Sequence, residues 1–129
     1  MTRLILLTAV LVLFAVSAGA QSRTIGYQGE LKIDGVPYDG DAYFKFVIVS
    51  GGETIWSNDG TSLSANVPSN AVSLNVRGGL LNVMLGNAAH PNMTPIPAST
   101  FTRPDAHIRM WFGGSDGAIF ELLTPDRPL

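Results

Sequence analysis

Two histidines, His90 and His107, are the side chains best suited to act as a general base at neutral pH. A serine hydrolase needs a histidine beside its nucleophile and an acid that orients that histidine. No serine of this chain lies in a Gly-x-Ser-x-Gly elbow. The two histidines are far apart and do not form the short His-x-His or His-Glu-x-x-His spacing of zinc sites. We therefore expect no catalytic residues, and the chain is predicted not to be an enzyme.

Carboxylates offer a second kind of chemistry. The only glutamates, Glu30, Glu53 and Glu121, lie beside turns or on strand-like segments, which does not suggest the facing pair that a glycosidase needs. Three aspartates surround a glycine-rich stretch, namely Asp34, Asp39 and Asp41. Oxygen-rich loops can bind calcium, but this spacing matches no ligand loop, and aspartate beside glycine is typical of turns. We expect turn chemistry, and no metal ion or cofactor.

The charge balance disfavours a nucleic-acid partner. The chain has 8 basic and 10 acidic side chains, a net charge of −2, and its basic residues are scattered singly. It contains no cysteine, which excludes thiol catalysis, disulfides and cysteine metal sites. The fold must therefore be held by a hydrophobic core, and roughly 100 residues are enough to form one.

One strip of side chains is a candidate binding surface. Between Ala106 and Phe112, apolar residues alternate with His107, Arg109 and Trp111, which places these three on the opposite face of a strand. Tryptophan and arginine are enriched at interface hot spots, and such a strip can stack on sugar rings or anchor a protein. The alternative is that a loop or a neighbouring domain covers it.

The elements that must position these residues are strands. The chain holds 14 glycines and 8 prolines, which separate short segments of alternating apolar and polar residues. These segments are 24–33, 42–49, 53–57, 71–77, 81–85, 106–112 and 118–123. No amphipathic helix longer than a turn is indicated. We predict an all-β fold, a single immunoglobulin-like β-sandwich of about seven short strands, with a jelly roll or a small barrel as the alternative.

The connections carry further predictions. Gly78-Gly79 joins 71–77 to 81–85, which indicates a β-hairpin. This hairpin carries one charge, Arg77, so we expect it to pair with another copy if it lies at a sheet edge. The polar stretch 61–70 is predicted to be a loop. Prolines keep 87–101 out of a central strand, and 97–101 is suited to one helical turn.

The N-terminus has the pattern of a secretory signal peptide. Arg3 precedes an apolar run over 4–16, and small residues stand before a predicted cleavage point after Ala20. The run is shorter than the roughly 18 to 20 residues that span a bilayer. We therefore expect a signal peptide at 1–20 and a soluble mature domain at 21–129, without a membrane span after cleavage. The expected location is extracellular or the cell surface, with the periplasm as the alternative.

Several motifs occur in a characteristic order. They are IGYQGEL at 25–31, FKFVIV at 44–49, IWSNDG at 55–60, AVSL at 71–74, GLLNVMLG at 79–86, IPASTF at 96–101 and RMWF at 109–112. As a set, over 24–129, the chain resembles a family of bacterial secreted and surface proteins that open with a "YQG-L" module and are mostly of unassigned function. The resemblance implies a β-rich, non-catalytic N-terminal module.

The resemblance also implies that more chain follows the module in such proteins. Pro125 and Pro128 read better as the start of a linker than as a closing strand. We therefore expect 21–129 to be the N-terminal part of a longer protein.

Two functions remain after these exclusions. The first is a secreted structural or interaction module of a bacterial surface protein, with a protein partner or self-association. The second is a carbohydrate-binding module that stacks a glycan on Trp111, Trp56 or Tyr38. The second function requires two of these rings to be exposed and roughly coplanar.

Overall fold

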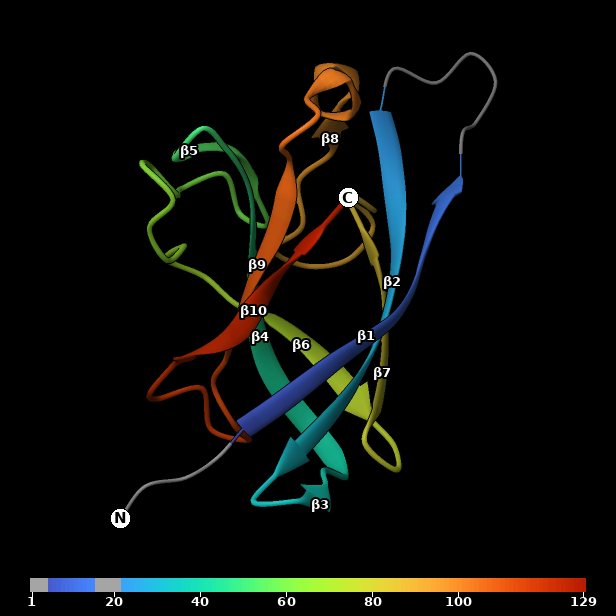
Figure 1. The fold of residues 1–129 in the computed structure, drawn as a ribbon. Coiled ribbons are helices and arrows are strands. Elements are labelled where there is room, and N and C mark those ends of the chain that lie inside the picture. Colours follow the sequence, from blue (N-terminus) through green and yellow to red (C-terminus); the bar gives the residue numbers. More distant parts are fainter. Residues whose placement is uncertain (1–4, 16–21) are drawn as a thin grey trace.

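The computed structural model describes residues 5–15 and 22–129, which form two antiparallel sheets of five strands each (Figure 1). The predicted cleavage point after Ala20, and Arg3 before the apolar run, lie outside the described residues. The two sheets are named the β2 sheet and the β4 sheet after their longest central strands.

The β2 sheet is built around β2 (Ser22–Ile33). One side of β2 pairs with β1 (Ile5–Ala15). Its other side pairs with β7 (Leu80–Leu85) and β3 (Val36–Pro37), and its first residues pair with β8 (Ile96–Pro97). Asp34 and Gly35 form the turn between β2 and β3 with φ of 52° and 80°, the positive values that an Asp-Gly pair accommodates in such turns.

The β4 sheet has β4 (Gly40–Ser50) at its centre. One side of β4 pairs with β9 (His107–Phe112), which in turn pairs with β10 (Glu121–Pro128). The other side pairs with β6 (Val72–Val76) along its first half and with β5 (Glu53–Ser57) along its second half. Each of the seven predicted segments therefore contains a strand, although the last strand begins at Glu121 and not at residue 118.

The core lies between the two sheets, because residue alternation directs one apolar face of each sheet inward. The side chains that the two central strands contribute to this core are Ile25, Tyr27 and Leu31 on β2 and Ala42, Phe44, Phe46 and Ile48 on β4. The ring centroids of Phe44 and Phe112 are 5.5 Å apart. Each large side chain buried in this way contributes about 1.5–3 kcal/mol. Two packed layers around one core confirm the predicted β-sandwich.

The predicted hairpin at 71–85 is wrong. Both strands form, but β6 pairs with β4 and β7 pairs with β2, so the Gly78-Gly79 turn carries the chain from one sheet to the other. A single bridge between Arg77 and Leu80 links the two ends. Alternation predicts which face of a strand is buried, but it does not say which strand lies next to it.

The predicted linker near Pro125 is also wrong, because Glu121–Pro128 is strand β10. Proline is tolerated there because β10 pairs with β9 alone, and the register shifts between Leu123 and Arg127. Two other predictions are confirmed. Residues 61–70 lie outside the strands, and Ala98–Thr102 forms a short 3₁₀ helix, η1.

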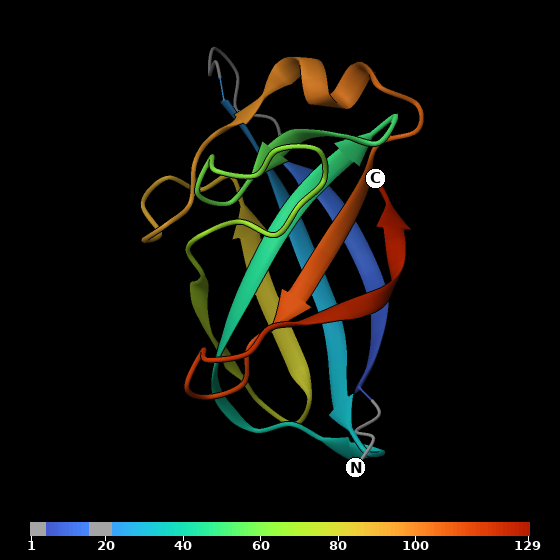
Figure 2. The ribbon, with the colours of Figure 1, turned by 90° about the vertical axis from the view of Figure 1, so that its left-hand side faces the viewer.

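The apolar run near the N-terminus forms β1. It pairs with every residue of β2 from Thr24 to Ile33, with a register shift between Ala9 and Leu11. β1 also contacts β10, so it lies where the edges of the two sheets come together, on the right-hand side of Figure 2. Within the described ranges, no helix is both long and apolar enough to cross a membrane.

Candidate functional site

The predicted strip of His107, Arg109 and Trp111 lies on β9, on the face of the β4 sheet that points away from the core. Trp111 is only 9% exposed there, and it packs against Val47 and Val49 of β4. Ala65, from the loop at 61–70, and Phe120 cover this cluster. Of the two interpretations of the strip, the structure favours the one in which a loop covers it.

The polar members of the strip are bound to Asp126 of β10. The Asp126 carboxylate accepts hydrogen bonds from Arg109 Nη2 at 2.9 Å and Arg109 Nε at 3.1 Å. His107 Nε2 lies 3.2 Å from the same carboxylate oxygen. This cluster fastens β10 to β9, so its polar groups serve structural contacts.

The other rings considered for a glycan platform are also packed into the fold. Trp56 is 5% exposed, and its Nε1 donates to the carbonyl of Thr94 at 3.0 Å. Tyr38 is half-buried with its ring edge-on to Phe112, 5.4 Å between centroids. Trp111, Trp56 and Tyr38 therefore do not form an exposed coplanar platform.

The remaining candidate residues for chemistry have local structural partners. His107 Nδ1 lies 2.9 Å from the carbonyl of Asp105, and His90 Nδ1 lies 3.1 Å from that of Pro91. Asp39 accepts a hydrogen bond from the Gly78 amide at 2.6 Å, which fastens it to the turn between β6 and β7. In the part of the chain that the structure describes, no three His, Asp or Glu side chains are grouped to hold a metal ion.

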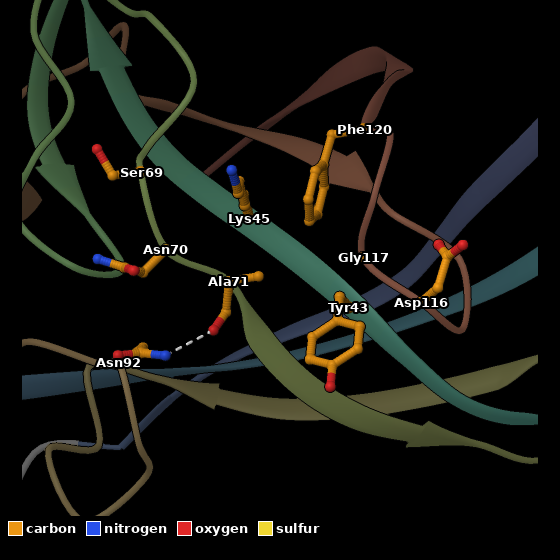
Figure 3. Close-up of a pocket in the computed structure, with 9 residues that line it drawn as sticks. All are labelled: Tyr43, Lys45, Ser69, Asn70, Ala71, Asn92, Asp116, Gly117 and Phe120. Atoms are coloured by element: carbon orange, nitrogen blue, oxygen red, sulfur yellow. Dashed lines mark hydrogen bonds between the residues drawn. The ribbon is translucent and has the colours of Figure 1, made fainter.

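The outward side of β4 carries a hollow of about 290 Å³ that the sequence did not indicate (Figure 3). Its lining residues are Tyr43, Lys45, Ser69, Asn70, Ala71, Asn92, Asp116, Gly117 and Phe120. The first two come from β4, and the others come from three loops at its two sides. The hollow is open and mostly polar, which suits recognition of a surface more than enclosure of a small substrate.

One wall of the hollow combines a cation with an aromatic ring. Lys45 Nζ lies 4.2 Å from the centroid of the Phe120 ring, a cation–π contact. The Tyr43 ring lies beside them, exposed, and Gly117 packs on it so closely that an added Cβ would lie 3.0 Å from Tyr43 Cδ2. The outward orientation of Tyr43 and Lys45 follows from the alternation along β4. The approach of Phe120 depends on how β10 folds back, which no local pattern encodes.

The other wall is held in place by the buried side-chain amide of Asn58. Asn58 Oδ1 accepts a hydrogen bond from the Phe46 amide at 2.9 Å. Its Nδ2 donates to the carbonyls of Asn70 at 2.9 Å and Asn92 at 3.2 Å. One fully buried side chain therefore connects β4 with both loops that form this wall.

Asp59 closes the loop above Asn58. Its carboxylate accepts hydrogen bonds from the Thr61 amide and hydroxyl, at 3.0 and 2.7 Å, and from the Asn70 amide and side chain, at 2.6 and 3.0 Å. Partial burial acts to raise the pKa of Asp59, but these four hydrogen bonds outweigh it and lower the pKa below the ordinary value of 3.8.

The lowered pKa predicts an acid-sensitive loop. A carboxylate whose pKa is depressed in the folded state stabilises the fold above its unfolded pKa, and this contribution is lost as the pH falls below about 3.8 through the folded value. Asp59→Ala is expected to reduce stability at neutral pH by about 1 kcal/mol, because Asp59 is partly exposed and water screens its interactions. Unfolding midpoints measured from neutral to acid pH should converge for the variant and the parent.

Asp116→Ala is the control for this prediction, since Asp116 is exposed and accepts one turn hydrogen bond, from Ala118. It should leave the acid profile unchanged. A gap between the Asp59 variant and the parent that stays constant down to the lowest pH would contradict the assigned role of the charge.

Two of the loops beside the hollow also carry the most exposed large apolar side chains of the described residues. Leu63, in the loop at 58–71, and Ile119, in the loop at 113–120, are each 77% exposed. We call the outward side of β4 together with these two loops the outer loop face. Large apolar side chains exposed on loops are typical of an interaction surface.

Comparison with known proteins places the chain in a family. No curated protein and no solved structure gives a significant match to the chain. A family model described as "Domain of unknown function (DUF8740)" matches residues 26–126, which cover both sheets from β2 to β10. The chain therefore belongs to the DUF8740 family of domains of unknown function.

Proposed function

We propose that this chain is an exported, non-catalytic interaction module of a bacterial surface protein, and that it associates with other copies of itself through the outer loop face. The observation that carries the proposal is the exposure of Leu63 and Ile119 on two loops that also contribute other residues to the hollow. Exposing two large apolar side chains to water is unfavourable, and association that covers them is favourable.

Two further observations support the proposal. The chain begins with the pattern of a signal peptide, and its motifs resemble those of secreted surface modules. The polar side chains that could have formed a reactive site, such as Arg109, Asp126 and His107, instead hold strands together. The sandwich therefore serves as a rigid support for the loops.

Carbohydrate binding, the second function considered from the sequence, has less support. Trp56 and Trp111 are buried, so the rings expected to stack on sugars are occupied by the core and the loops. Tyr43 is the exposed ring of the hollow, and a single ring gives a smaller stacking surface than the expected pair.

The proposal predicts self-association that depends on named side chains. The chain, exported from a bacterial host with its own leader, should increase in mass with concentration when light scattering is measured. The double variant Leu63→Ser and Ile119→Ser should weaken this association by about tenfold or more, because each lost apolar contact is worth about 1 kcal/mol or more. Both residues are exposed, so folding stability should change by less than about 0.5 kcal/mol.

The matched control is Val36→Ser. Val36 is 64% exposed but lies on β3, after the β2–β3 turn and off the outer loop face. It should leave association unchanged. A parent that stays monomeric at every concentration, or equal weakening by the double variant and the control, would overturn the proposal.

A further inference from the structure

A strand of the structure is formed by residues that belong to the predicted signal peptide. β1 spans Ile5–Ala15, with the sequence ILLTAVLVLFA, which carries no charge and one polar side chain, that of Thr8. The predicted cleavage after Ala20 removes all of β1 from the mature chain. This inference rests on that part of the proposed function.

Removing β1 would leave one side of β2 without a partner strand. β1 pairs with β2 at every residue from Thr24 to Ile33, whereas β7 and β3 occupy the opposite side. The two sides are distinct, because Tyr27 pairs with Val12 of β1 and also with Val83 of β7. Cleavage would therefore uncover a continuous row of backbone donors and acceptors in the longest strand of the sandwich.

The uncovered edge would also open a seam between the sheets. β1 contacts β10 of the β4 sheet as well as β2, and Figure 2 shows these strands closing one side of the sandwich. Tyr27 of β2 is 2% exposed, and burial raises the pKa of its hydroxyl to about 12, although the charge of Arg127 on β10 acts to lower it. Tyr27 of β2 and Arg127 of β10 therefore come from the two strands that border the seam.

We propose that the mature module accepts an extended apolar segment of a partner polypeptide, which adds to β2 as an antiparallel strand in the position of β1. The geometry of the chain's own β1 specifies the occupant: about ten uncharged residues rich in leucine and valine, without proline, in contact with both β2 and β10. A charged segment would bring charge next to buried side chains such as Ile25, Tyr27 and Leu31 of β2, which is unfavourable without a partner.

The test starts from the whole 129-residue chain, exported by a bacterial host with its own leader. Mass spectrometry of the exported protein first determines its N-terminus. A mature chain that begins at Gln21 meets the requirement of the inference. Exported protein that retains residues 1–20 would contradict the predicted cleavage, and with it both the processing in the proposed function and this inference.

The processed protein is then mixed with a peptide of the β1 sequence, flanked by lysines for solubility. We expect one peptide to bind per chain, the thermal midpoint to rise because only the folded state binds, and hydrogen exchange to slow within residues 24–33. The control peptide carries Leu7→Pro and Leu13→Pro, which removes two backbone donors and prevents strand pairing. The control peptide should bind at least about tenfold more weakly than the β1 peptide.

The remaining outcomes also decide the question. Processed protein that is unfolded alone but folds when the peptide is added supports the inference. The inference is overturned by a processed protein that is stable and shows no binding, or by equal binding of the proline peptide. It is also overturned by protection that leaves residues 24–33 unchanged, or by protein that stays unfolded with the peptide. These results leave the outer loop face untouched, because its test depends on Leu63 and Ile119.

Discussion

Asn58→Ala is expected to destabilise the sandwich by about 4 kcal/mol. The substitution leaves the buried Phe46 amide and the two partly buried carbonyls of Asn70 and Asn92 without their partner. Each unsatisfied buried group costs about 1–3 kcal/mol, and the whole fold is stabilised by only about 5–15 kcal/mol. Denaturant unfolding, with the midpoint and the slope compared between variant and parent, measures the loss.

Two further substitutions define the cause of that loss. Asn82→Ala, at an exposed position of β7, should change stability by less than about 0.5 kcal/mol. Asn58→Asp keeps the size and the acceptor for the Phe46 amide but removes the donors to the two loop carbonyls, so it should also be strongly destabilising. A loss below about 1 kcal/mol for Asn58→Ala would show that the three backbone groups find other partners.

Gly86→Ala is expected to cost about 2–4 kcal/mol, which combines a strained backbone with overpacking. Gly86 follows β7 with φ of 92°, a conformation that residues with a Cβ rarely adopt. The added Cβ would lie 2.7 Å from the backbone oxygen of Arg23 and 2.9 Å from Ile96 Cγ1. The backbone of Arg23 is paired with β8 and cannot move freely. Thermal or denaturant unfolding measures the effect.

Gly52→Ala separates the two contributions. Gly52 has φ of 77°, but an added Cβ there would meet nothing within 4 Å. Its cost should be that of the backbone alone, about 1 kcal/mol. Equal losses at Gly86 and Gly52 would refute the close contact with Arg23 and Ile96 as the reason that glycine occupies position 86.

The strands were predictable because their signal is local. Along β4, Phe44 and Phe46 alternate with Tyr43 and Lys45, and a strand can bury one set only by exposing the other. The same rule predicted that His107, Arg109 and Trp111 share the outer face of β9. The Asp34-Gly35 turn was predictable too, because few residue pairs adopt two successive positive φ angles.

Strand pairing was not predictable in the same way. Leu74 of β6 and Leu81 of β7 have the alternation of a hairpin, yet they lie in different sheets. Pro125 suggested a linker, and β10 accepts it because a register shift and an edge position remove the need for its missing amide hydrogen. Both outcomes depend on which strands are neighbours in space.

The features of the candidate site also fall into those that the sequence predicts and those that depend on tertiary packing. Residue alternation alone determined the all-β class, the seven main strands and the outward direction of Tyr43 and Lys45, since a period of two residues is a property of each strand by itself. Tertiary packing decided that Phe120 meets Lys45, that Asn58 joins two loops to β4, and that Ala65 covers Trp111. Those contacts join segments far apart in the chain, and they are set by the mutual burial of the two sheets rather than by any local pattern.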